Sequence, residues 1–219
     1  MTDQQVLSER GRRDGDTERR ILTAARTVFM RRGTAGARMQ EIAEEAGVNQ
    51  ALLHYYFRSK EGLAEAVFRE AASGLIPSAV RVLGSDATLE EKVEQFVHLY
   101  IDTVRQHPFI PGYVLAELHH HPQRLAALVS ELAGPAATPA GMAFIQRLGA
   151  QLRERAATGA IRPIAPHQFF VNLLSLCVFP FVARPLLLTV LGMDEEAFGR
   201  FLDERRAELP GFVLNALRP

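Results

Sequence analysis

The chain has little of what marks several protein classes: one cysteine, no tryptophan and no excess of charge among 219 residues. The single cysteine, Cys177, excludes an internal disulfide framework. The 25 basic and 25 acidic side chains cancel, so no overall field attracts a polyanion. The first residues, MTDQQVLSERGRRDGD, lack the apolar segment of a signal peptide. We therefore expect a cytoplasmic protein in which Cys177 is a buried, unreactive thiol rather than a redox sensor.

Long apolar runs and strand patterns are also missing. The most apolar stretch, residues 168–183, holds 16 residues without a formal charge. Asn172 and Pro180 interrupt this stretch, and it is too short to span a bilayer. No segment alternates apolar and polar residues between turn residues, whereas apolar residues at helical spacing recur throughout. The sequence therefore predicts an all-α fold.

The charge is uneven along the chain. Residues 1–60 carry 11 Lys or Arg against 8 Asp or Glu, and the remaining residues carry 14 against 17. Residues 1–15 are polar, and we expect them to form a mobile basic arm. The next residues predict three short helices, from Thr17 to Gly33, over 39–46, and from the N-cap Asn49 to about Arg58, followed by a helix that Ser59 caps and Lys60 begins.

The rest of the chain is more apolar and predicts longer helices. Thr88 and Glu91 form a capping box in front of a helix through Arg105. Pro180 and Pro185 are expected to bend or interrupt the later helix in which they lie. The clearest loop is AGPAATPAG, residues 133–141. The other helices are expected over residues 109–121, 122–132, 141–157, 166–191 and 194–217.

Two short helices joined by a tight turn, residues 39–58, have the layout of a helix-turn-helix. Gly47 permits the sharp turn and Val48 fills the junction. On the second helix, polar side chains share the face opposite the apolar Leu53 and Phe57. The exposed face is formed by Gln50, Ala51, His54 and Tyr55.

Such a face suits the major groove of B-form DNA, where Gln and His side chains meet base edges and Ala51 meets a thymine methyl group. Tyr56 and Lys60 are then placed to reach phosphates, Lys60 with the help of a helix N-terminus. Arg38 and the arm residues can add backbone contacts that fix position without reading sequence. These arm residues are Arg10, Arg12, Arg13, Arg19 and Arg20.

The stretch from Thr17 to about Val67 resembles the DNA-binding domain of the TetR/AcrR family of transcriptional regulators. The resemblance rests on ILTAARTVF, on IAEEAGV, and on a recognition helix that ends in two tyrosines and Phe before SKEGL. The chain departs from the family pattern at His54, where Tyr is usual, and at Ala37 and Arg38, where Ser or Thr usually opens the first motif helix. The departures affect the individual roles of these residues, not the fold.

The resemblance implies three regions: the arm over residues 1–15, a helix-turn-helix DNA-binding domain over 16–62, and a ligand-binding and dimerisation domain over 63–219. It implies a ligand-responsive regulator, more often a repressor, that binds a palindromic operator as a homodimer and is released by a small-molecule inducer. Expected ligand-binding residues are Phe96, Tyr100, Phe109, Tyr113, His119, Phe170 and Asn172. Expected dimer-interface residues are Phe179, Phe181, Leu186, Leu187, Phe198, Phe201, Leu202 and Leu209.

Two other readings stay open. Glu117, His119 and His121 suggest an all-α metal-dependent enzyme, although consecutive helical residues point about 100° apart and three adjacent histidines cannot close on one ion. A constitutive DNA binder without an inducer is the other. The chain offers no nucleophile with a base at a recognisable spacing, no phosphate-binding glycine loop and no acid pair. We therefore expect no catalytic residue, no metal and no cofactor.

Overall fold

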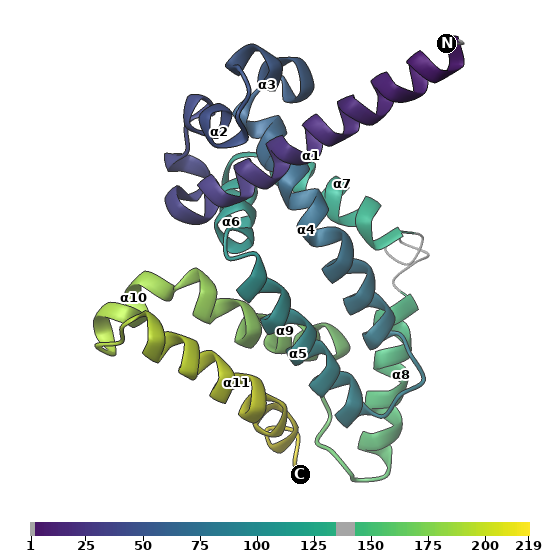
Figure 1. The fold of residues 1–219 in the computed structure, drawn as a ribbon. Helices are drawn as coiled ribbons and strands as arrows, with labels where there is room; N and C mark the ends of the chain where they lie inside the picture. Colours follow the sequence, from purple (N-terminus) through teal and green to yellow (C-terminus); the bar gives the residue numbers. More distant parts are fainter. Residues whose placement is uncertain (1–2, 135–142) are drawn as a thin grey trace. The chain divides into compact units, whose positions relative to one another are not determined.

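The computed structural model describes residues 3–134 and 143–219, which form eleven α-helices and no strand (Figure 1). The all-α prediction is confirmed. The chain divides into two compact units, Met1–Ala71 and Ala72–Pro219. The helices are α1 (Asp3–Gly36), α2 (Met39–Ala46), α3 (Gln50–Phe57), α4 (Lys60–Leu83), α5 (Leu89–Gln106), α6 (Ile110–His120), α7 (Pro122–Ala133), α8 (Ala143–Ala157), α9 (Pro166–Val182), α10 (Arg184–Val190) and α11 (Glu195–Asn215).

In the first unit, α1 begins at Asp3 rather than near Thr17, so residues 3–15 are helical. Their predicted mobility stays a prediction. Gly33 interrupts α1 as expected, because its φ of 68° and ψ of 167° lie outside the helical region. The inner face of α1 is buried and packs on α2. Its buried residues are Ile21, Ala24, Ala25, Val28 and Phe29.

The start of α4 requires a glycine. Ser59 Oγ accepts a hydrogen bond from the Gly62 N–H at 3.1 Å, which caps the helix. A Cβ atom at Gly62 would lie 2.5 Å from the Phe57 carbonyl oxygen, closer than non-bonded atoms approach. The glycine therefore lets the end of α3 and the first turn of α4 lie against each other.

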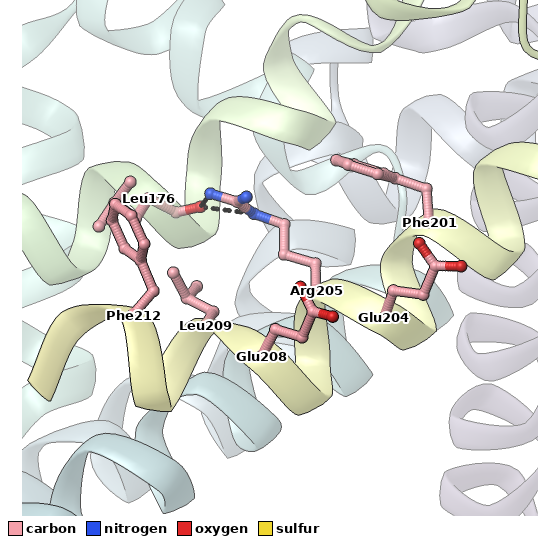
Figure 2. A pocket seen from close by; sticks show the side chains of 7 residues that line it. All are labelled: Leu176, Phe201, Glu204, Arg205, Glu208, Leu209 and Phe212. Atoms are coloured by element: carbon pink, nitrogen blue, oxygen red, sulfur yellow. Dashed lines mark hydrogen bonds between the residues drawn. The ribbon is translucent and has the colours of Figure 1, made fainter. Parts of the chain in front are cut away.

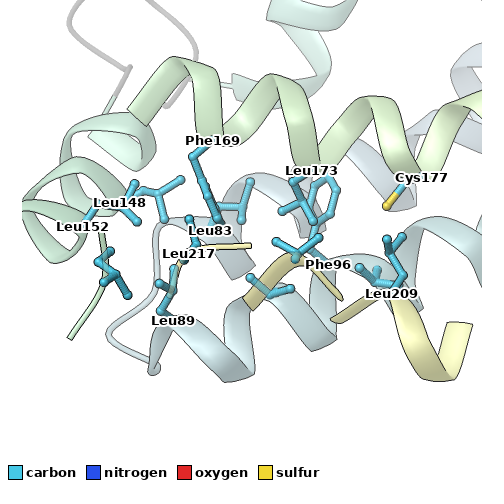
Figure 3. Packing of buried hydrophobic residues seen from close by; sticks show 14 of the residues in the cluster. Leu83, Leu89, Phe96, Leu148, Leu152, Phe169, Leu173, Cys177, Leu209 and Leu217 are labelled. Atoms are coloured by element: carbon cyan, nitrogen blue, oxygen red, sulfur yellow. The ribbon is translucent and has the colours of Figure 1, made fainter. Parts of the chain in front are cut away.

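The second unit surrounds one apolar core, shown in Figure 3. The Thr88–Glu91 capping box is present in front of α5, as predicted. The α5 helix packs on α11 and α9, and α8 packs on α9. Gly149 permits the close approach of α8, since a Cβ atom there would lie 2.7 Å from Pro166 Cγ. The core residues include Leu83, Leu89, Phe96, Leu148, Leu152, Phe169 and Leu173.

The apolar stretch over 166–191, which Pro180 and Pro185 were expected to bend or interrupt, is two helices, α9 and α10, which meet at an angle of 69°. The predicted interruption is confirmed. Pro180 has no N–H, so it cannot donate to the carbonyl of Leu176 one turn earlier. Arg205 of α11 supplies the missing donors, with Nη2 and Nε at 2.7 and 3.2 Å from that oxygen (Figure 2). Within the described ranges no single helix passes the length and apolarity test for a membrane span, and α9 and α10 pass it only as a bent pair.

Cys177 lies on the buried side of α9 with 0% of its surface exposed. Burial raises the pKa of its thiol to about 12, and the charge of Arg205 offsets this only in part. The thiol is therefore protonated at neutral pH, which agrees with the expectation of an unreactive cysteine.

Two glycine substitutions in α4 should have opposite effects on stability. Gly62→Ala forces a Cβ atom against a backbone carbonyl and should lower the free energy of unfolding by about 1–3 kcal/mol. Gly74→Ala meets nothing within 4 Å and should raise it by about 0.5–1 kcal/mol, because alanine favours a helix over glycine. Chemical denaturation followed by circular dichroism measures both. Equal effects for the two variants would contradict the steric account of Gly62.

Candidate nucleic-acid interface

The turn between α2 and α3 is built around Gly47, whose φ of 63° and ψ of 39° are left-handed. A residue with a Cβ atom is strained there. The N–H groups of Gly47 and Val48 donate to the carbonyls of Glu44 and Ala43 at 3.1 and 3.0 Å. This pattern ends α2 and turns the chain within two residues. Asn49 then begins α3, as its Oδ1 accepts from the Leu52 N–H at 2.8 Å.

The α3 helix is attached to its unit by Leu53, which is 0% exposed. The four residues predicted to form the reading face are all exposed: Gln50, Ala51, His54 and Tyr55. Tyr55 is 75% exposed and packs edge-on against Tyr56, with ring centroids 5.2 Å apart. An aromatic ring so exposed gains little from burial within its own unit, so packing alone does not explain this face.

His54 has a defined tautomer in this geometry. Its Nδ1 lies 2.9 Å from the Arg58 carbonyl oxygen. A carbonyl only accepts, so Nδ1 carries the proton in this hydrogen bond. In the neutral ring, Nε2 is then an acceptor. Arg58 itself has a φ of 62°, which is unusual for a residue with a side chain.

Tyr56 and Lys60, predicted to reach phosphates, also bind within the first unit. The Tyr56 hydroxyl donates to Asp14 Oδ1 at 3.1 Å. Desolvation, and then this hydrogen bond and the charge of Asp14, raise the pKa of Tyr56. The Lys60 ammonium donates to the carbonyls of Ala35 and Ala37 at 3.0 and 3.4 Å. One of its three N–H groups therefore stays available.

The basic side chains predicted to contact the DNA backbone differ from one another in their hydrogen-bond partners. Arg38 is exposed at the N-cap of α2 and makes no capping hydrogen bond with its side chain. Arg19 pairs with Asp16 at 2.6 Å. Arg20 instead donates to the carbonyls of Ala46 and Gly47 at 2.8 and 3.2 Å. The side chains of three further arm residues, Arg10, Arg12 and Arg13, lie outside the described part of the structure.

The residues predicted to bind a ligand do not form one cluster. Phe96 stacks on Tyr100 and meets Phe170 edge-on, at centroid distances of 6.2 and 6.4 Å. Phe170 also meets Phe144, a residue that the sequence did not suggest, at 5.8 Å. Phe109, at the N-cap of α6, and Tyr113, within α6, are both buried. His119 and Asn172 are exposed. Burial raises the pKa of Tyr100, and among the described residues its hydroxyl has no hydrogen bond.

The residues predicted for a dimer interface separate into three groups by exposure. Phe198, Leu202 and Leu209 are buried by their own chain, with at most 5% exposed. Phe179 and Leu186 are 55% and 58% exposed. Phe181, Leu187 and Phe201 are half-buried. The sequence analysis did not identify four other exposed apolar residues, which lie in the same helices and in the turn between α10 and α11. These residues are Val171, Val190, Leu191 and Phe212.

The histidine-containing segment does not assemble a metal site. Glu117 is 7% exposed, and its two oxygens accept hydrogen bonds from Arg124 at 2.5 and 2.9 Å. His119 and His121 are exposed. No group of three His, Cys, Asp or Glu among the described residues could hold a metal ion. The carboxylate that would have served as a ligand is thus held by a guanidinium.

Comparison with known proteins agrees with the geometry of the first unit. Residues 21–67 match the family model of bacterial regulatory proteins, tetR family. The chain is 37% identical over 98 residues to the HTH-type transcriptional regulator BetI of Rhizobium meliloti (strain 1021), which covers 45% of this chain and 47% of BetI. It spans about half the length of the curated relatives it matches.

Two solved structures share the fold over most of the chain. The TetR family transcriptional regulator PfmR from Thermus thermophilus is 19% identical with a TM-score of 0.64, over 91% of this chain and 99% of PfmR. The transcriptional regulator FadR from Bacillus subtilis, solved in complex with stearoyl-CoA, is 16% identical with a TM-score of 0.61, over 91% of this chain and 98% of FadR. At these identities the likeness concerns the fold alone.

Residues 21–67 of the first unit therefore form a helix-turn-helix domain, in which α2 and α3 are the two motif helices. The family match and the relatives above identify this part of the chain as the DNA-binding domain of the tetR family of bacterial regulatory proteins. The predicted resemblance is confirmed. These relatives are regulators and not enzymes, so the enzyme alternative is set aside.

Proposed function

We propose that the chain acts in the cytoplasm as a dimeric repressor, which binds a palindromic operator and releases it when a small molecule occupies the second unit. The observation that carries the DNA-binding part is the outward face of α3. This helix buries one residue completely, Leu53, and leaves Gln50, Ala51, His54 and Tyr55 exposed. A helix of this kind fits the major groove.

The chemistry of the face suggests which base edges it reads. The Gln50 amide can both donate to and accept from adenine. His54 Nε2, an acceptor while Nδ1 donates to Arg58, suits the amino group of cytosine or adenine. Ala51 suits a thymine methyl group. Arg38, Tyr56 and the remaining N–H of Lys60 would then contact phosphates, with Tyr56 exchanging Asp14 for a phosphate oxygen.

A recognition helix as short as α3 reads few base pairs, so specificity requires a second copy. The exposed apolar side chains of α9, α10 and α11 offer a surface for it. Phe179, Leu186 and Phe212 are each more than half exposed. Beside Phe212 lies a cavity of about 230 Å³, lined by residues of α9 and α11 (Figure 2). A self-complementary contact through these helices would give the two-fold symmetry that a palindrome needs.

Control by a ligand is supported by the aromatic cluster of the second unit. Phe96, Tyr100 and Phe170 lie together, and the Tyr100 hydroxyl has no hydrogen bond within the described ranges. Apolar walls with one polar group are typical of small-molecule sites. FadR, whose fold is alike, was solved with stearoyl-CoA bound.

Release would act through α4, which begins at Lys60 in the first unit and ends at Leu83 in the second. A ligand that prefers one position of this helix changes the separation of the two recognition helices. Its differential affinity for the two states sets how far DNA binding falls. Repression is favoured over activation because it is the more frequent output in this family. A constitutive binder is the alternative if no ligand changes DNA affinity.

Gln50→Ala should change sequence preference more than general affinity. On a duplex enriched by the wild-type protein from a randomised library, we expect a loss of about 1–3 kcal/mol, and a much smaller loss on a scrambled duplex. Fluorescence anisotropy at several salt concentrations measures both. Gln95→Ala, at an exposed glutamine of α5, is the matched control. No binding of the wild type at low salt would reject DNA binding, and equal losses on both duplexes would reject the role of Gln50.

Leu186→Asp should weaken the dimer. A charge in the centre of an apolar contact is expected to raise the dissociation constant at least about tenfold, seen as a shift toward monomer in sedimentation velocity. Leu118→Asp is the control, since Leu118 of α6 is similarly exposed at 53% but lies on another element. A monomeric wild type, or equal effects of the two variants, would contradict the proposed interface.

Tyr100→Phe should weaken the ligand and leave the fold intact. A thermal-shift screen of metabolites, with hits tested for release of DNA, identifies the compound. Removing the hydroxyl should then cost about 1–3 kcal/mol of ligand affinity in calorimetry, because a buried group of the ligand loses its partner. Tyr55→Phe, in the first unit, should leave ligand affinity unchanged. Unchanged affinity in Tyr100→Phe would place the ligand elsewhere.

A further inference from the structure

We infer that Arg20 is a positioning residue for DNA recognition, which holds the turn between α2 and α3 and does not itself contact phosphate. The inference rests on the proposed DNA-binding function and adds a residue to it. The family match begins at residue 21, so it does not include this arginine. The sequence alone suggested the opposite role, that of a basic arm residue placed to meet the DNA backbone.

The end of α2 leaves carbonyl groups without helical partners, as every helix end does. The N–H groups of Gly47 and Val48 satisfy two of them, Glu44 and Ala43. The carbonyls of Ala46, the last residue of α2, and of Gly47, in the turn, also need hydrogen-bond donors. Nη2 of Arg20 donates to both, at 2.8 and 3.2 Å, from a position 26 and 27 residues earlier in the chain.

The charge of Arg20 suits this place. The C-terminal end of a helix carries partial negative charge, which a guanidinium stabilises. A charged donor to a carbonyl also makes a stronger hydrogen bond than a neutral one. Arg20 extends from α1, next to the buried Ile21, so its backbone is fixed by the domain core. The turn is thereby tied to α1 as well as to α2.

The turn decides where α3 points. Only two residues separate Gly47 from the first residue of α3, and α3 has a single completely buried side chain, Leu53. A small change in the Gly47 peptide therefore moves Gln50 and His54 relative to the base edges. A base contact is lost when its geometry changes by a fraction of an ångström to an ångström, whereas contacts to mobile phosphate-binding side chains tolerate more.

Arg19 offers a matched comparison. It is the same residue type at the adjacent position, but its side chain is exposed and pairs with Asp16, three residues earlier on the same helix. Its Nε also approaches the Gly15 carbonyl at 3.4 Å, on its own helix. Removing Arg19 takes the same charge from the domain without touching the turn.

The test compares Arg20→Ala, Arg20→Lys and Arg19→Ala on the enriched and scrambled duplexes. Arg20→Ala should lower affinity for the enriched duplex about tenfold, the effect of losing a base contact, and change affinity for the scrambled duplex little. The slope of log affinity against log salt should stay as in the wild type. Arg20→Lys, which keeps the charge and one donor centre, should recover part of the discrimination. Arg19→Ala should leave discrimination unchanged.

Hydrogen exchange of the free protein tests the contact independently of DNA. The amides of Gly47 and Val48 should exchange faster in Arg20→Ala than in the wild type or in Arg19→Ala. A salt slope reduced by about 0.9 would show a phosphate contact and overturn the inference. Equal losses on both duplexes, or unchanged exchange at the turn, would overturn it as well. Failure of the wild type to bind any duplex would instead reject the proposed function, and the exchange data would still decide whether Arg20 holds the turn.

Discussion

The burial of Leu53 fixes α3, the second helix of the motif, to its domain, and the arrangement of the candidate interface follows from it. With one residue of α3 at 0% exposure and the opposite face in solvent, the helix is oriented but only lightly covered. A short helix held in this way depends on its ends. Asn49 caps the beginning and Gly47 sets the turn before it, so these small features define a surface that no large hydrophobic area supports.

Several basic side chains in this protein donate hydrogen bonds to backbone carbonyl groups. Arg20 binds carbonyls at the end of α2, Lys60 binds the carbonyls of Ala35 and Ala37, and Arg205 binds the carbonyl that Pro180 leaves without a donor. Buried or half-buried carbonyls need partners, and long cationic side chains can reach them across helices. Counting charge along the N-terminal sequence therefore overstates the charge that faces DNA.

Much of the fold was predictable because its signals are local. The Thr88–Glu91 box, the Asn49 cap and the interruption at Gly33 lie where the sequence placed them, since each depends on a few neighbouring residues. The exposed face of α3 followed from helical spacing in the same way. The partner of Tyr56 did not, because Asp14 lies 42 residues away and nothing in either segment indicates the other.

Helical periodicity also predicted the apolar faces of α9 and α11, but it did not predict which elements pack against those faces. Leu209 was expected at a subunit interface and instead belongs to the intrachain core, whereas Phe212 is 62% exposed. Both residues are apolar and lie on the same helix, so composition does not distinguish them. Only the packing of α5 against α11, and the core that α11 shares with α9, decide which side chains remain for a partner.

The buried position of Cys177 determines how readily its thiol reacts with oxidants and other reagents. A protonated sulfur with no exposed surface reacts slowly with peroxide, electrophiles or disulfides, so Cys177 responds little to oxidants. The same property is useful in the laboratory. A cysteine introduced on the surface of α3 would be the only readily labelled thiol, and a fluorophore attached there could report the approach of DNA without removal of the natural residue.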